Sequence, residues 1–75
     1  MNDRIDIDPK IQHGKPVIRG TRVTVACIVS GLAGGMTFEQ VQDDYGIADA
    51  DIRAALDFAA QLVEDEEHFA LPAQG

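Results

Sequence analysis

The sequence predicts a mainly α-helical domain, in which three helices follow a short N-terminal strand segment. The helices are predicted between residues 24 and 63, where apolar residues recur at helical spacing behind residues that can cap a helix. The strand is predicted at residues 4–8, where polar and apolar side chains alternate. We divide the single domain into an N-terminal strand and basic Gly/Pro loop (1–23), a three-helix core (24–63) and an acidic C-terminal tail (64–75).

The predicted strand places Ile5 and Ile7 on one face, and its candidate mates are Val17–Ile18 and Arg22–Val23. A two-stranded ribbon is marginal in water. A chain of 75 residues also buries only about 60% of the surface that its unfolded form exposes. We therefore expect a homodimer, across which the strands are able to pair.

A shaped basic loop is predicted from His13 to Arg22, which reads His-Gly-Lys-Pro-Val-Ile-Arg-Gly-Thr-Arg. Its glycines can adopt positive φ, and its proline fixes its own φ. Lys15, Arg19 and Arg22 lie on this loop, so they are candidate contacts for the phosphates of DNA. Alternatively, the same cations neutralise the protein's own acidic helices.

The first helix is predicted to begin at the cap Thr24 and to end at Gly34–Gly35, where a left-handed residue is available. Its apolar stripe has the spacing i, i+3, i+4, i+7 and consists of Val25, Ile28, Val29 and Leu32. The single cysteine, Cys27, lies in the apolar part of this helix and is most simply a small core residue.

The second helix is predicted at roughly Phe38 to Tyr45. Thr37 and Gln40 have the spacing of a capping box at its start, and Gly46 ends it. The third helix is predicted to be capped by Asp49. Its predicted buried face consists of Ile52, Ala55, Leu56, Ala59, Leu62 and Val63.

The second and third helices fit the spacing of a helix-turn-helix. Four apolar positions would lock the two helices across the turn: Val41, Tyr45, Ile47 and Ile52. The helix that would read DNA carries Arg53 beside Asp49, Asp51 and Asp57. Carboxylates are repelled by phosphates, so the alternative is a three-helix core whose third helix makes no DNA contact.

The net charge of −7 is unevenly distributed. Residues 1–22 contain five Lys/Arg and three Asp, a net +2, whereas residues 23–75 contain one Arg and ten Asp/Glu, a net −9. Such a chain favours a basic protein as its partner, and the alternative is that its acidic surface only keeps a small protein soluble. Glu64–Glu67 end the third helix, and Phe69 and Leu71 follow, as in a segment that becomes ordered on a partner. A solvated tail with Phe69 packed on the core is the alternative.

No catalytic or metal-binding pattern is visible. His13, Cys27 and His68 lack the spacing of a zinc site, and one cysteine permits no internal disulfide. The chain has no run of about 18 apolar residues, so we expect no membrane span. Its N-terminus lacks the apolar stretch of a secretion signal. We expect a cytoplasmic protein that is not an enzyme and needs no cofactor.

Five segments closely resemble a small bacterial family, domain-of-unknown-function family 433: residues 5–9, 13–23, 35–41, 44–45 and 51–56. The shared signature is Gly-Lys-Pro-x-Ile-x-Gly-Thr-Arg, and the likeness extends from residue 4 to about 60. The resemblance implies a homeodomain-like three-helix bundle behind a strand ribbon. It also implies a VapB-like antitoxin of a type II toxin–antitoxin pair, whose toxin is a nuclease with a PIN-like fold.

In this interpretation the acidic part of the chain covers the basic groove of the toxin. The expected toxin contacts are Asp57, Glu64, Asp65, Glu66, Glu67, Phe69 and Leu71. The dimer would also bind operator DNA and regulate its own operon. The expected DNA contacts are Lys15, Arg19, Arg22 and Arg53. Two alternatives stay open, which are a stand-alone DNA-binding regulator without a toxin and a pure dimerisation or adaptor module.

Overall fold

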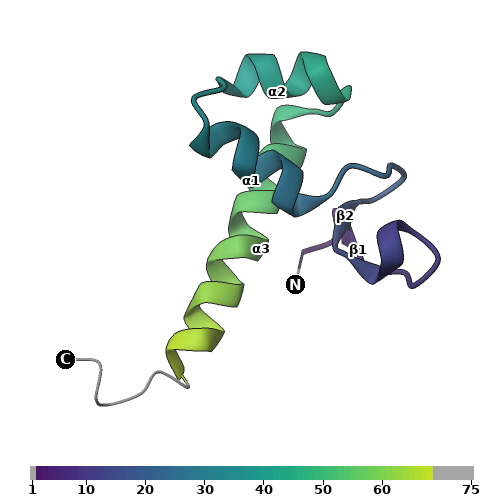
Figure 1. Ribbon diagram of the computed structural model, residues 1–75, viewed down its shortest axis with the longest axis vertical. Coiled ribbons are helices and arrows are strands. Elements are labelled where there is room, and N and C mark those ends of the chain that lie inside the picture. Colours follow the sequence, from purple (N-terminus) through teal and green to yellow (C-terminus); the bar gives the residue numbers. More distant parts are fainter. Residues whose placement is uncertain (1, 69–75) are drawn as a thin grey trace.

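The computed structural model describes residues 2–68, with side chains through residue 65, and has three helices preceded by a two-stranded ribbon (Figure 1). The elements in chain order are β1 (Ile5–Asp6), the single turn η1 (Gln12–Gly14), β2 (Val17–Ile18), α1 (Val25–Ala33), α2 (Phe38–Tyr45) and α3 (Asp49–His68). The mainly helical fold class predicted from the sequence is thereby confirmed.

The ribbon is completed within one chain. β1 pairs with β2 in antiparallel orientation, with Ile5 opposite Ile18. On the other side of β2, the backbone N–H of Ile18 donates to the carbonyl of Val23 at 2.9 Å, and Val17 forms a bridge with Thr24. Val17–Ile18 is therefore the mate of β1, whereas Val23 bonds to β2 and not to β1, and no second chain is needed to pair β1.

The helices α1 and α2 begin at the predicted caps. Thr24 Oγ1 accepts a hydrogen bond from the backbone N–H of Cys27 at 3.0 Å. Thr37 and Gln40 form the complete capping box, and Gly46 ends α2 with a left-handed φ of 66°. These side chains satisfy backbone donors that the first helical turn leaves without a partner.

The start of α3 corrects one prediction. Asp49 is the first residue of the helix rather than its cap. The residue before the helix is Ala48, whose backbone N–H donates to Asp51 Oδ2 at 2.9 Å. A carboxylate three residues into the helix thus reaches back to the cap position, as the second half of a capping box does.

The core lies where the first half of α3 meets α1, α2 and the ribbon. Its most deeply buried residues are Val17, Ile18, Ile28, Val41, Ile52 and Ala55. The apolar positions predicted to join α2 and α3 are in this core, with Ile47 buried and Tyr45 packed against its edge. The apolar spacing of the helices therefore identified the residues that hold them together.

The second half of α3 departs from the predicted burial. Leu62 is 49% and Val63 55% exposed, although both were expected in the buried face. Ala54, which was not expected there, is buried. Figure 1 shows the reason, because α3 continues well beyond the ends of α1 and α2. It also continues past Val63 to His68, so the tail predicted to begin at residue 64 starts inside this helix.

Candidate functional site

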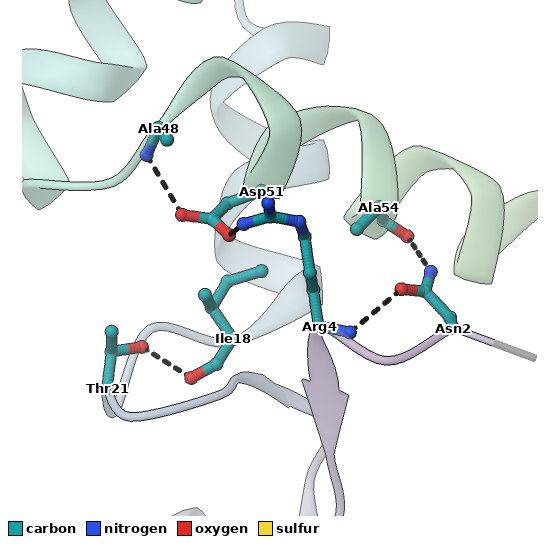
Figure 2. A network of polar contacts seen from close by, with 7 residues as sticks. All are labelled: Asn2, Arg4, Ile18, Thr21, Ala48, Asp51 and Ala54. Carbon is teal, nitrogen blue, oxygen red and sulfur yellow. Dashed lines mark hydrogen bonds and ion pairs between the residues drawn. The ribbon is translucent and has the colours of Figure 1, made fainter.

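The Gly-Thr pair of the basic loop builds a turn. Gly20 has a φ of +81°, and the backbone N–H of Thr21 donates to the carbonyl of Ile18 at 2.9 Å. The hydroxyl of Thr21 donates to that same carbonyl at 2.8 Å and accepts from the N–H of Val23 at 2.9 Å (Figure 2 shows the first of these bonds). Gly20 and Thr21 therefore shape the backbone of the turn and offer no side chain to a ligand.

The rest of the loop is fastened to the start of α1. The carbonyl of Pro16 accepts from the N–H of Val25 at 2.9 Å, and Gln12 Nε2 donates to the carbonyl of Arg22 at 2.9 Å. The turn η1 is left-handed, with φ of 49° at Gln12 and 59° at His13. The loop is therefore a hydrogen-bonded platform, on which a few exposed side chains are displayed.

The cations of the loop fall into two groups. Arg19 Nη2 lies 3.0 Å from Asp6 Oδ1, and this hydrogen bond, with the charge of Asp6, raises the pKa of Arg19. Lys15 and Arg22 are exposed and form no ion pair with any residue through position 65. The neutralisation considered from the sequence thus applies to Arg19, whereas Lys15 and Arg22 face solvent.

Arg53, the one cation of the would-be reading helix, is also engaged within the chain. Its Nε lies 2.8 Å from Asp49 Oδ2, and its Cζ lies 5.5 Å from the centre of the Phe38 ring. Exposed ion pairs of this kind are weak, about 0–1 kcal/mol. The first turn of α3 nevertheless presents carboxylates at the position from which a recognition helix contacts bases.

Two contacts hold the N-terminus against α3 (Figure 2). Arg4 Nη1 lies 2.9 Å from Asp51 Oδ1, and Asn2 Nδ2 donates to the carbonyl of Ala54 at 2.6 Å. The Oδ1 of Asn2 accepts from the N–H of Arg4 at 3.3 Å. β1 is therefore fixed beside the first turns of α3, although the two elements are about 45 residues apart in sequence.

This arrangement leaves a groove of about 420 Å³ between the ribbon and the projecting half of α3. Its lining residues are Asn2, Ile5, Ile7, Asp57, Phe58, Gln61, Leu62 and Asp65. We call it the β1–α3 groove. Ile5 and Ile7 share this side of the chain as predicted, but only Ile5 is buried, since Ile7 is 61% exposed.

The expected toxin contacts lie partly in this groove. Asp57 and Asp65 line it, and Glu64 is exposed beside it on α3. Glu66 and Glu67 belong to α3, but their side chains are outside the described part of the chain. Phe69 and Leu71 also lie outside the described residues.

Sequence reasoning missed the apolar half of the groove. The apolar spacing of the sequence gives Phe58 no role, and it predicts Leu62 in the buried face of the third helix. The spacing of Phe58 and Leu62, i and i+4 on one helix face, was the available signal, because such residues lie one above the other. That signal does not reveal that the N-terminal ribbon forms the opposite wall.

Residues 2–65 contain no group of three or more His, Cys, Asp or Glu side chains that could hold a metal ion. In the part of the chain that the structure describes, no helix is long and apolar enough to cross a membrane. Cys27 is half-buried. Its hydrogen bond with Tyr45 raises the pKa of Tyr45, and the charge of the Cys27 thiolate raises it further. The described side chains thus offer surfaces for binding, and the β1–α3 groove is a largely apolar one among them.

Comparison with known proteins gives one family. The family model described as "Protein of unknown function (DUF433)" matches residues 5–59. A Mycobacterium tuberculosis protein, provisionally named antitoxin VapB45, is 43% identical over 54 residues, which are 72% of this chain and 23% of that protein.

Two crystal structures share the fold. Rv2018 from Mycobacterium tuberculosis has a TM-score of 0.64 and 40% sequence identity, over 69% of this chain and 24% of its own. A DUF433 member from Anabaena variabilis has a TM-score of 0.76 and 27% identity, over 87% of this chain and 65% of its own. The chain spans about a quarter of the length of the mycobacterial relatives.

Proposed function

Because this chain belongs to the DUF433 family, which its match over residues 5–59 shows, we propose that it is the antitoxin of a type II toxin–antitoxin pair. It binds a PIN-like nuclease toxin and neutralises it without catalysing a reaction itself. The relative named as an antitoxin supports this role, since it is 43% identical over the shared 54 residues.

The observation that carries the proposal is the projecting half of α3. It is exposed, apolar at Leu62, and acidic at Asp57, Glu64 and Asp65. A nuclease that holds RNA has a basic groove, and an acidic surface is complementary to such a groove. In this proposal Glu66, Glu67, Phe69 and Leu71 extend the same contact surface.

The test is purification of the tagged chain from its native host and identification of any nuclease bound to it. We expect the two proteins to co-purify at equal amounts, and a chain that ends after Val63 to lose most of the nuclease. The full-length variant Glu39→Gln is the control, since Glu39 is an exposed carboxylate on α2. Retention of the nuclease by the shortened chain would exclude the tail as a contact.

Regulation of its own operon is the second part of the proposal. A homodimer would display Lys15 and Arg22 twice, and these two cations carry no ion pair with residues through position 65. Phosphate contacts make binding steeply dependent on salt. We expect Lys15→Ala with Arg22→Ala to weaken operator binding and flatten its salt dependence more than Arg19→Ala with Arg53→Ala does.

A stand-alone DNA-binding regulator is the alternative function. It predicts strong, salt-dependent operator binding by the isolated chain, with no co-purifying nuclease. In this alternative too, Lys15 and Arg22 are the main expected DNA contacts, because Arg19 and Arg53 already have the acidic partners Asp6 and Asp49.

A further inference from the structure

The β1–α3 groove has the composition of a protein-binding site. Its apolar wall consists of Ile5 and Ile7 on the ribbon side and of Phe58 and Leu62 on α3. Its volume of about 420 Å³ lies within the range of about 300–1,000 Å³ that is typical of ligand sites, so it can admit more than one aliphatic side chain. Large apolar side chains left in contact with water at one place are typical of interaction sites.

The two walls of the groove are joined by contacts within the unbound chain. Arg4 is paired with Asp51, and the side chain of Asn2 is bonded to the backbone of Ala54, as Figure 2 shows. These contacts join the ribbon to α3 directly beside the groove, which begins at Asn2 and extends along α3 to Asp65. A preformed site avoids part of the entropy loss that accompanies ordering on binding.

The charges of the groove select among possible occupants. Asp57 and Asp65 lie among its lining residues, and no Lys or Arg does. The whole sequence after Arg53 contains five Asp or Glu and no Lys or Arg. A second copy that laid its own α3 in the groove would bring like charges together, whereas a basic segment would form opposite-charge pairs.

We propose that the β1–α3 groove is the docking site for a basic amphipathic segment of the partner protein. The apolar side chains of that segment enter between Ile7 and Leu62, and its Lys or Arg residues pair with Asp57 and Asp65. An amphipathic helix that inserts its apolar side chains into a groove is an established mode of recognition. The inference rests on the proposed function, because the toxin is the partner that would supply the segment.

Site-specific photocross-linking tests this proposal in the producing cell. The photoreactive amino acid p-benzoylphenylalanine is placed at Gln61, which lines the groove, and in a matched variant at Val63. Val63 is exposed on the same helix but does not line the groove. We expect Gln61 to cross-link to a partner segment that is both basic and apolar, and Val63 to do so far less.

The cross-linked segment is then made as a synthetic peptide, and its affinity for the purified full chain is measured. Leu62→Ser should weaken binding at least about tenfold, the loss typical of a central interface residue. Val63→Ser should change it less than about twofold, as a residue outside the contact does. Asp57→Asn with Asp65→Asn should weaken binding and flatten its salt dependence relative to Asp43→Asn with Asp44→Asn, two exposed carboxylates of α2 that do not line the groove.

Several results would overturn the groove as a docking site. These are equal cross-linking from both positions, no cross-linked partner, and a cross-link to a second copy or to residues 69–75 of the same chain. Equal loss of peptide affinity in Leu62→Ser and Val63→Ser would overturn it too. A cross-linked segment from a protein that is no nuclease would leave the groove in place and refute the antitoxin function. A nuclease that binds the chain outside the groove would refute the groove as the docking site and leave the antitoxin function in place.

Discussion

Arg4 and Asp51 form an ion pair that joins the N-terminal strand to the third helix, with 2.9 Å between Nη1 and Oδ1. The second oxygen of the same carboxylate accepts from the backbone N–H of Ala48 at 2.9 Å. The Asp51 side chain is only 14% exposed. One carboxylate therefore both completes the start of α3 and fastens β1 to it.

Replacing Asp51 should destabilise the chain more than replacing its partner does. Asp51→Ala removes both contacts, and we expect the free energy of unfolding to fall by about 1–2 kcal/mol, the usual loss for a capping side chain. Arg4→Ala removes the ion pair alone, for which less than about 1 kcal/mol is expected. Urea denaturation followed by circular dichroism measures both. Equal losses would contradict the double role of Asp51.

The turn at Gly20 should tolerate no side chain. Its φ of +81° disfavours L-residues, while no atom lies within 4 Å of the position of an added Cβ. Gly20→Ala should therefore lower the free energy of unfolding by about 1–2 kcal/mol through backbone conformation alone. Gly34→Ala is the matched control, because Gly34 has a φ of −82°. If both variants unfold alike, strain at Gly20 is not the cause.

Burial along α3 should determine which of its apolar residues stabilise the isolated chain. Ile52→Ala should lower the free energy of unfolding by about 2–5 kcal/mol, since Ile52 is fully buried. Leu62→Ala and Val63→Ala should change it by about 0.5 kcal/mol or less, because both residues are about half exposed. Thermal and urea unfolding of the purified chain provide the measurement. A large loss at Leu62 or Val63 would mean that the helix is covered in solution.

Tyr45 should ionise at an unusually high pH. The hydrogen bond with Cys27, with the charge of the thiolate, raises the pKa of Tyr45 above its ordinary value of 10.0. A raised pKa in the folded state contributes stability that is complete below pH 10 and is lost as pH rises through the folded-state pKa.

The chain contains one tyrosine and no tryptophan, so absorbance near the phenolate band reports this group alone. We expect a midpoint above 10.0 in the native chain, and a lower one in Cys27→Ala and in the denatured chain. An identical midpoint in the native chain and in Cys27→Ala would rule out Cys27 as the cause.

Local signals in the sequence were sufficient to locate the caps of α1 and the two ends of α2, but not the start of α3. Thr24, Thr37 and Gly46 act where their side-chain or backbone chemistry predicted, because a cap depends only on residues within one turn. The start of α3 was misplaced by one residue, since both Asp49 and Asp51 are acceptors and only the structure shows that Asp51 bonds to Ala48.

The candidate site was less accessible from sequence. Apolar spacing indicates which face of a helix is apolar, but it does not indicate where the neighbouring helices end, so Leu62 and Val63 were assigned to the core. The β1–α3 groove depends on contacts about 50 residues apart, such as Asn2 with Ala54. Sequence periodicity contains no information about such a pairing.

The antitoxin function is tested most directly by separating the nuclease that co-purifies with this chain from it and titrating that nuclease with the purified chain. The measured quantity is the rate of RNA cleavage at increasing molar ratios of chain to nuclease. We predict that cleavage falls to background near one chain per nuclease, and that Leu62→Ser needs a clear excess where Val63→Ser does not. Undiminished cleavage at a large excess of the folded chain would contradict the proposed function.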